Sequence, residues 1–370
     1  MNKKRLWAGI DLGVETACVC IINDAGDVLH QGVCPSSTTS VRHELDGFRR
    51  ERFASVALES GMGMHVARGL TSLGYPVELY EARQLSKFLR ARRNKTDAGD
   101  AIGIAEAARI GASVVSKVYV KSLESQSLQS RLAIRRHLVR QRVAAVSMLS
   151  RQIELFGGRL TCDSRRAGFR PEVEAEIQRL FPEGPAELVA QLRFLADHCE
   201  RLIAYQHAID RDLEQAAAGN DVCRRLMEIP GIGPLCALTF YAAVGDPHRF
   251  ARSARIGSYF GLAPRIHESG RTRRKSRISK MGNRSVRSLL VRAAGHHLRY
   301  GKRDSALHDW TLRIEQRRGR MPSRVALARK LAVIMLAIWK SGGHFEPRDR
   351  RPAASYPPAR WAFGSSAAVR

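Results

Sequence analysis

The chain has 370 residues, and its 44% hydrophobic content is ordinary for a globular protein with a buried core. A formal net charge of +27 at pH 7 indicates a polyanionic partner, because such a surface attracts phosphate over long range. The longest apolar run, residues 331–339, is too short for a transmembrane helix, and seven scattered cysteines with no Cys-x-x-Cys pair disfavour a zinc site or a disulfide framework. We therefore expect a cytoplasmic protein without a signal peptide and with no membrane partner.

Residues 1–120 predict a mixed α/β domain. Three β-leaning runs come first, with a turn signal at residues 23–26, and helices then alternate with strands. Hairpin strands followed by such alternation are typical of this class. The expected strands are 6–10, 17–22, 28–33, 53–58 and 76–80, and the expected helices are 40–51, 63–73 and a further set from residue 82 onward.

Residues 121–220 predict a helical region. Apolar residues recur at helical spacing from 122 to 156, a second helical stretch covers 185–217, and a polar, basic connector lies between them. The pattern fits a helical hairpin packed on itself, and equally a coiled-coil arm for dimerisation or for holding nucleic acid. The apolar positions are Leu128, Leu132, Val139, Val143, Val146 and Ile153.

The charge is concentrated in the last part of the chain. Residues 221–370 contain 31 Lys and Arg against 9 Asp and Glu, whereas residues 1–220 contain 31 against 26. Residues 221–346 predict a second compact, helix-rich unit of the all-α class. Residues 347–370, rich in Pro, Arg, Ala and Ser, favour a disordered basic tail.

Four carboxylates stand out in the N-terminal domain. Asp11 interrupts one apolar strand and Glu59 ends another, and a buried charge there needs a cation or a partner. Asp97 and Asp100 are three residues apart, so they share one face of a helix that Thr96 is placed to cap. Four carboxylates suit two Mg²⁺ ions about 3.5–4 Å apart, which can stabilise the attacking and leaving oxygens of a phosphate.

Each acid alone has a plainer interpretation, since an Asp-x-x-Asp at a helix start is often a solvated cap. Their combination in strand–strand–helix order favours the metal site of a ribonuclease H-like fold. The run of residues 9–13, Gly-Ile-Asp-Leu-Gly, also suits an actin-like ATPase or a sugar kinase. That alternative lacks a convincing second Gly-rich phosphate loop, and it leaves the basic C-terminal unit unexplained.

Residues 229–234, Ile-Pro-Gly-Ile-Gly-Pro, lie between two helical patterns and predict a helix–hairpin–helix motif. Gly231 and Gly233 would let backbone N–H groups approach DNA phosphates without sequence preference, and an ordinary helix–helix turn is the alternative. Residues 249–303 then hold 16 Lys and Arg and a single acid, Glu268, which favours phosphate contact over a merely solvated face. The candidate contacts are Arg265, Arg271, Arg273, Arg274, Lys275, Arg277, Lys280 and Arg284.

Ser269 precedes a glycine within this basic run. Its hydroxyl could attack a phosphodiester while nearby guanidinium groups stabilise the developing charge. A Ser-Gly pair is also common in turns, and the residues alone leave both interpretations open.

Taken in order, these motifs resemble the DEDD transposases of the insertion sequence 110 family, also described as bridge-RNA-guided recombinases. The resemblance spans about residues 6–345, and each motif is modest alone, whereas the full set in this order is highly specific. It rests on Gly9-Ile10-Asp11, Leu58-Glu59-Ser60-Gly61, Asn94-Lys95-Thr96-Asp97-x-x-Asp100-Ala101, Ile229-Pro230-Gly231-Ile232-Gly233, Gly261-Leu262-x-Pro264-Arg265, Glu268-Ser269-Gly270 and Ser279-Lys280-x-Gly282-x-x-Ser285-x-Arg287.

The resemblance implies a RuvC-like domain, a coiled-coil insertion and a transposase domain. By position, Asp11, Glu59, Asp97 and Asp100 match the metal-binding acids, and Ser269 matches a nucleophile that joins covalently to cleaved DNA. It further implies a bacterial, Mg²⁺-dependent recombinase, nucleoid-associated when bound, with donor DNA, target DNA and a non-coding bridge RNA as partners. The expected assembly is a homo-oligomer, dimer to tetramer, in which the acids of one subunit serve the serine of another.

Two other functions stay open at this point. A junction-cleaving nuclease, or a DNA invertase without a guide RNA, would use the same acids. An architectural DNA-binding protein would hold them only as structural residues.

Overall fold

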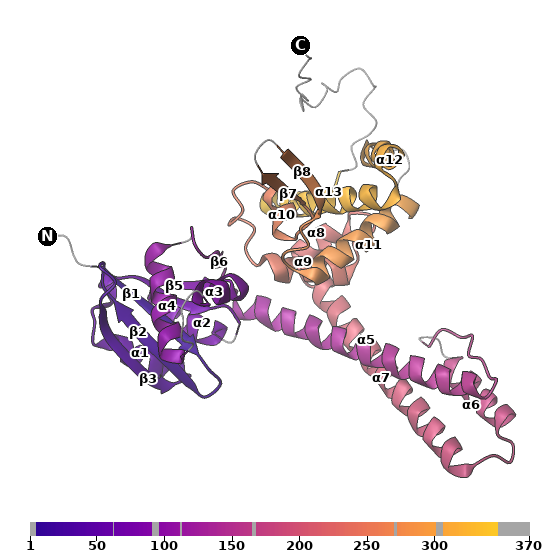
Figure 1. Cartoon of the computed structure of the whole chain (residues 1–370). Coiled ribbons are helices and arrows are strands. Elements are labelled where there is room, and N and C mark those ends of the chain that lie inside the picture. The colour runs from indigo at the N-terminus through magenta and orange to yellow at the C-terminus, as the bar shows by residue number, and fades with distance from the viewer. Residues whose placement is uncertain are drawn as a thin grey trace, which may run out of the picture. The chain divides into compact units, whose positions relative to one another are not determined.

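The computed structural model describes residues 5–61, 63–90, 96–111, 113–164, 168–269, 272–300 and 306–346. The predicted tail at 347–370 and the candidate contact Arg271 lie outside these residues. Contacts divide the chain into two compact units, the first ending at Leu123 and the second beginning at Glu124 (Figure 1). No helix of the described ranges is long and apolar enough to span a membrane.

The first unit is built on a six-stranded sheet with the order β3-β2-β1-β4-β5-β6. The first three strands form an antiparallel meander, β1 then pairs in parallel with β4 and β4 with β5, and β6 closes the far edge antiparallel to β5. The predicted mixed α/β architecture is therefore confirmed. The strands are β1 (Leu6–Leu12), β2 (Thr16–Ile22), β3 (Val28–Pro35), β4 (Phe53–Glu59), β5 (Val77–Tyr80) and β6 (Lys117–Val118).

Helices cover both faces of this sheet, which explains why β1 and β2 are apolar along most of their length. Strand residues alternate between faces. Ala17, Val19 and Ile21 pack in the cluster that includes residues of α1 (Thr38–Asp46) and α2 (Met64–Ser72). Cys18, Cys20 and Ile22 pack instead against Ala101 and Ala105 of α4 (Asp97–Ile110).

Helix ends in this unit follow local capping chemistry. Ser37 caps α1, and Thr96 caps α4 by accepting a hydrogen bond from the backbone N–H of Gly99 at 3.0 Å, as predicted. The predicted helix at 40–51 is shorter in the structure, because α1 ends at Asp46 and the separate 3-10 turn η1 (Arg50–Arg52) follows. Helix α3 (Ala82–Leu89) packs beside α4.

Gly9 is where α4 crosses β1. A Cβ atom at this position would lie 2.2 Å from the carbonyl oxygen of Ala101 and 2.3 Å from the backbone nitrogen of Ala105. Backbone atoms of a packed helix cannot move aside cheaply, so only glycine permits this approach.

Gly9→Ala should therefore lower the free energy of unfolding by about 3 kcal/mol, the upper part of the usual cost of overpacking. Urea unfolding followed by circular dichroism would measure it. Gly47→Ala is the matched control, since Gly47 has an ordinary φ of −65° and nothing within 4 Å of its added methyl group. Equal stability of the Gly9→Ala and wild-type proteins would contradict the close crossing.

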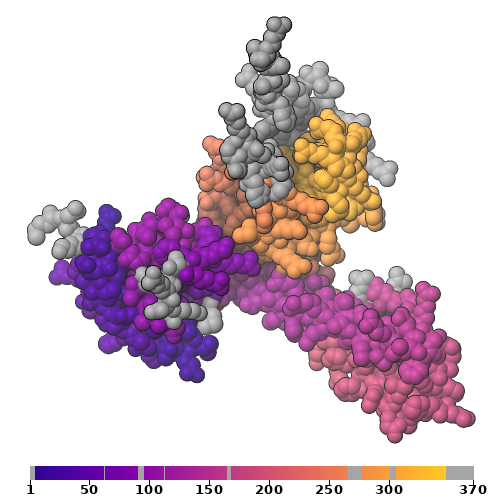
Figure 2. All heavy atoms as spheres, viewed as in Figure 1, coloured from indigo at the N-terminus to yellow at the C-terminus, as the bar shows by residue number. Residues whose placement is uncertain are grey.

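The second unit begins with an antiparallel pair of long helices, α5 (Leu123–Leu155) and α7 (Ala186–Ala218), with α6 (Phe169–Leu180) at their far end (Figure 1). Arg131 pairs with Asp212 at 2.6 Å and Arg135 pairs with Asp210, so rising numbers on α5 meet falling numbers on α7. Figure 2 shows α6 and the ends of α5 and α7 that adjoin it as one packed body.

The apolar stripe predicted on α5 is only partly buried. Leu128, Leu132 and Ile153 lie in apolar clusters, but Val143 is 50% exposed. In that stretch the two helices are joined by polar contacts, because Arg142 donates to the side chain of Gln206 at 2.8 Å. The helices therefore pack on each other as a hairpin, and a role in oligomerisation stays a prediction.

The remainder of the second unit packs around α9, whose apolar side chains are nearly all buried. A two-stranded antiparallel hairpin, β7 and β8, interrupts the helices, whereas the sequence predicted a purely helical unit. The elements are α8 (Asp221–Met227), α9 (Pro234–Val244), α10 (Arg255–Tyr259), β7 (Pro264–Ser269), β8 (Thr272–Ile278), α11 (Arg284–Tyr300), α12 (Ala306–Arg318) and α13 (Arg320–Ser341).

Candidate active site

Asp11 and Glu59 lie side by side at the edge of the sheet where the parallel strands β1 and β4 end. The last parallel pair of β1 and β4 is Ile10 with Leu58, and the two acids are the next residue of each strand. Both acids lie on the face of the sheet that α4 covers. Alternate residues of a strand share a face, and Trp7 of β1 and Ala57 of β4 pack with residues of α4. Two strands that are adjacent in space thus place their carboxylates at the same edge and on the same face.

The first turn of α4 lies at this edge. Ala101 and Ala105 cross β1 at Gly9. Near the end of the helix, Arg109 donates to the carbonyl oxygen of Asp24. Asp24 comes just after β2, whose last residue pairs with Trp7 near the start of β1. The helix therefore runs antiparallel to β1. Its first residue, Asp97, and then Asp100 lie toward the end of β1 that carries Asp11.

The thiol of Cys18 lies where these charges meet. Cys18 is paired with Asp11 across β1 and β2. Burial raises the pKa of this thiol, and the negative charges of Asp97 and then Asp11 raise it further. Two acids from different elements thus act on one buried atom, which supports their proximity.

The acids do not form a closed ligand shell. Asp11, Glu59 and Asp100 are half-buried and Asp97 is exposed. Within the described ranges, no group of three or more His, Cys, Asp or Glu side chains is close enough to hold a metal ion. Carboxylate oxygens at one edge are nevertheless the donors that a hard divalent cation prefers, and the four-acid metal site stays a prediction.

Ser269 lies at the tip of the β7–β8 hairpin. Its backbone pairs with Thr272, the first residue of the return strand, and two residues separate them in the chain. The predicted basic contacts Arg273, Arg274 and Lys275 follow on β8, where their backbones pair with Glu268, His267 and Ile266. The side chains of Ser269 and of these three basic residues lie outside what the structure describes.

Four further candidate contacts, Arg265, Arg277, Lys280 and Arg284, are exposed. Arg265 also donates to the carbonyl oxygen of Ser279 at 2.9 Å, which ties β7 to the segment after β8. Exposed guanidinium and ammonium groups around the hairpin suit phosphate contact.

The turn at 229–234 connects α8 and α9, and its glycines have different surroundings. Gly231 has a φ of +92°, and a Cβ atom there would lie 2.6 Å from the carbonyl oxygen of Ala293 on α11. His297 of α11 also bonds through Nδ1 to the carbonyl oxygen of Pro230 at 3.1 Å. Glycine at 231 is therefore required by packing within the protein, whereas Gly233 is exposed with open space around it. The helix–hairpin–helix contact with DNA stays a prediction.

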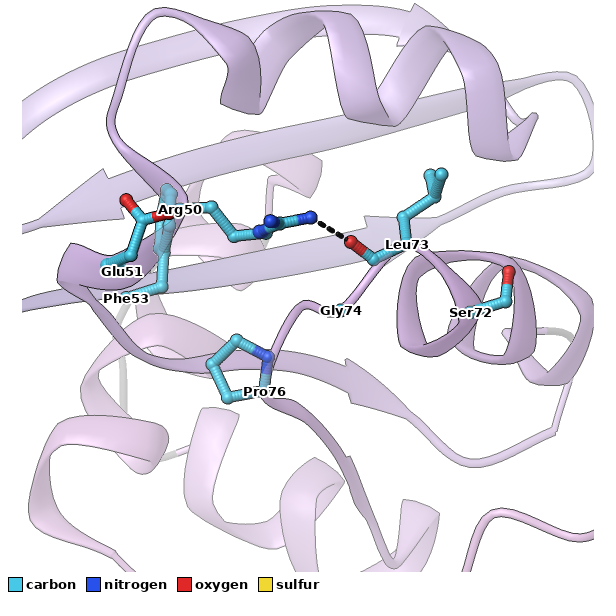
Figure 3. Close-up of a pocket in the computed structure, with 7 residues that line it drawn as sticks. All are labelled: Arg50, Glu51, Phe53, Ser72, Leu73, Gly74 and Pro76. Atoms are coloured by element: carbon cyan, nitrogen blue, oxygen red, sulfur yellow. Dashed lines mark hydrogen bonds between the residues drawn. The ribbon is translucent and has the colours of Figure 1, made fainter.

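A shallow pocket lies at the opposite edge of the sheet from the acids (Figure 3). It opens where β4 and β5 begin, and Arg50 donates to the carbonyl oxygen of Leu73 across it. None of the four acids lines it, so it is not part of the candidate active site. Its lining residues are Arg50, Glu51, Phe53, Ser72, Leu73, Gly74 and Pro76.

Comparison with known proteins identifies the family of both parts of the chain. A transposase model of the DEDD IS110 type matches residues 8–156, which include the four acids, and the model described as "Transposase IS116/IS110/IS902 family" matches residues 223–309, which include Ser269. The transposase for insertion sequence element IS1111A of Coxiella burnetii is 30% identical over 344 residues, 89% of this chain and 88% of the relative. The chain belongs to the IS110 family of transposases.

Two further relatives extend the comparison of this IS110-family transposase. A probable family 20 transposase of Pseudomonas aeruginosa is 32% identical over 299 residues, 79% of this chain and 86% of the relative. A pilin gene-inverting protein of Moraxella bovis is 33% identical over 126 residues, 33% of this chain and 38% of the relative. The family resemblance predicted from the motifs is confirmed, and with it an enzyme that cleaves DNA and transfers strands. DEDD domains of this kind usually use divalent metal ions.

Sequence reasoning missed three features of this region. Cys18 carries no motif, and only the pairing of β1 with β2 brings it to Asp11. The β7–β8 hairpin lacks an alternating apolar pattern. Arg287 stood in the last motif without a role, and its contacts with two backbone carbonyls appear only in the structure.

Proposed function

We propose that this transposase exchanges DNA strands through a two-part active site, with Ser269 as nucleophile and Asp11, Glu59, Asp97 and Asp100 as ligands of two Mg²⁺ ions. The observation that carries the proposal is the placement of Asp11 and Glu59 at neighbouring strand ends beside the first turn of α4. The position of Ser269 at the tip of a basic hairpin supports the second part.

The chemistry conserves phosphodiester bonds. The Ser269 Oγ attacks a backbone phosphorus and gives up its proton to solvent. The bond from phosphorus to one sugar oxygen breaks, and that oxygen takes up a proton and leaves as a sugar hydroxyl. The DNA strand stays joined to the serine through a phosphodiester until a sugar hydroxyl of a second strand attacks and releases it. One bond forms for each bond that breaks, so no energy-supplying cofactor is needed. Bound Mg²⁺ would stabilise charge on the attacking and leaving oxygens.

The partners in this proposal are donor DNA, target DNA and a non-coding bridge RNA, bound by a homo-oligomer of up to four subunits. The excess of 31 Lys and Arg over 9 Asp and Glu in residues 221–370 supports a nucleic-acid surface in this part of the chain. A second candidate is DNA inversion without a guide RNA, which the similarity to a pilin gene-inverting protein favours.

An in vitro recombination assay tests the proposal. The full chain would be mixed with DNA carrying the ends of its element and a target, with RNA transcribed from the flank of the element, in Mg²⁺ or in EDTA. We expect joined products and a covalent protein–DNA adduct in Mg²⁺, and loss of both in EDTA. Recombination that does not depend on the RNA would favour inversion. Cleaved ends that never carry protein would contradict the serine mechanism and favour a junction nuclease.

A further inference from the structure

Two short segments interlock at the base of the β7–β8 hairpin. One precedes β7 and contains Gly261, and the other follows β8 and contains Gly282, both with positive φ, +67° and +82°. A Cβ atom on Gly261 would lie 2.0 Å from the carbonyl oxygen of Met281, and one on Gly282 would lie 2.0 Å from that of Tyr259. The two backbones therefore touch where neither glycine could carry a side chain.

Backbone hydrogen bonds join the same two segments. The N–H of Ser279 donates to the carbonyl of Ala263 at 2.8 Å, and the N–H of Lys280 donates to the carbonyl of Gly261 at 3.1 Å. Lys280 itself has a φ of +56°, a conformation that a lysine adopts only where the surroundings enforce it. Residues 259–263 and 279–282 thus form a closely packed backbone contact at the base of the hairpin, the hairpin joint.

Arg287, near the start of α11, bridges this joint. Its Nη1 donates to the carbonyl oxygen of Phe260 at 3.0 Å and to that of Met281 at 3.3 Å, one from each segment. The side chain is half-buried, and burial, with a smaller effect of Arg284, lowers its pKa from the usual value for arginine. A guanidinium remains charged at neutral pH despite such a shift, so both contacts are charge-assisted.

We propose that Arg287 is a positioning residue for Ser269, an inference that rests on the proposed role of that serine. In the described part of the chain the hairpin forms a sheet of two strands alone, and an isolated two-stranded hairpin is marginally stable. The placement of its tip therefore depends on its base, where Arg287 donates to one backbone carbonyl of each segment. A displaced nucleophile loses reactivity steeply, since an error of about 1 Å can cost on the order of 100-fold in rate.

The test compares Arg287→Met and Arg287→Lys with the control Arg292→Met, which removes the same charge from an exposed position of the same helix. Three quantities would be measured on the full chain: DNA affinity, the single-turnover rate of adduct formation at saturating DNA, and amide hydrogen exchange.

We expect Arg287→Met to lower the rate on the order of 100-fold, with little change in DNA affinity. Exchange should accelerate in residues 259–283 but not in the sheet of the first unit. Arg287→Lys should recover part of the rate, because an ammonium group can still donate to a carbonyl, and the control should match the wild type in rate and exchange.

Three outcomes would overturn the inference: an unchanged rate at saturating DNA, unchanged exchange in the hairpin, or a loss confined to DNA affinity, which would make Arg287 a phosphate ligand. Exchange also separates this inference from the proposed nucleophile, because Ser269→Ala should leave the joint intact. If the hairpin loosens in Arg287→Met while the wild-type protein cleaves DNA without an adduct, the nucleophile assignment fails although the joint is real.

Discussion

Ser269→Ala should abolish the covalent protein–DNA adduct and the joined products. Alanine lacks the oxygen that would attack phosphorus. Loss of a nucleophile that acts as a unit with its surroundings costs on the order of 10⁶-fold in rate, as far as this can be measured above background. Denaturing gel electrophoresis of labelled DNA after incubation with Mg²⁺ would resolve adduct from free strand.

The control for this experiment is Ser276→Ala, because Ser276 belongs to β8 of the same hairpin and the chemical change is identical. It should form adduct as the wild type does. DNA affinity should be unchanged in Ser269→Ala, since a neutral hydroxyl adds little to a surface dominated by arginine. An adduct that persists in Ser269→Ala would show that another side chain, and not this serine, is the nucleophile.

The sequence predicted the strands of the first unit because their apolar character is local. The strands at 6–10, 17–22 and 53–58 contain runs of apolar or β-branched residues that specify strand without further context. The adjacency of Asp11 and Glu59 is a different kind of property. It depends on the pairing of Ile10 with Leu58, residues far apart in the chain, and a shift of one residue would move Glu59 to the other face.

The β7–β8 hairpin could not be predicted for a related reason. Its strands read Pro-Arg-Ile-His-Glu-Ser and Thr-Arg-Arg-Lys-Ser-Arg-Ile, with no apolar face to indicate a period of two. The hairpin is held instead by contacts at its base, where Gly261 and Gly282 meet and Arg287 binds carbonyls of both segments. Tertiary packing here decides a conformation that local sequence leaves open.

Two further positions fit a sequence pattern, but only the structure shows which residues surround them. Val143 fits the helical stripe of α5, yet it is exposed because that stretch pairs with α7 through Arg142 and Gln206. Gly231 fits a phosphate-binding turn, yet the close approach that requires glycine is to α11. The sequence pattern identifies such a position, but only the fold shows which neighbouring residues contact it.

Asp11→Asn should abolish DNA cleavage while leaving the protein folded and able to bind DNA. The amide matches the carboxylate in size but is a poor ligand for Mg²⁺, and the neighbouring acids cannot replace a donor at the end of β1. We expect a loss of at least about 10³-fold in the cleavage rate, comparable with removal of one major electrostatic contribution to a transition state. A quenched-flow assay with labelled DNA and saturating Mg²⁺ would measure it.

Metal binding can be followed separately from activity, through thermal unfolding. Without a cation, Asp11→Asn changes the charge but hardly the size of a half-buried side chain, so we expect it to unfold near the wild-type temperature. With Mg²⁺, an ion that binds only the folded state should raise the melting temperature of the wild type. That increase should be lost in Asp11→Asn and kept in the control Glu51→Gln, whose side chain lines the pocket at the opposite edge of the sheet. A melting temperature of Asp11→Asn that rises with Mg²⁺ as the wild type's does would mean that the ion binds elsewhere. The acids at the sheet edge would then be acting without the metal assigned to them.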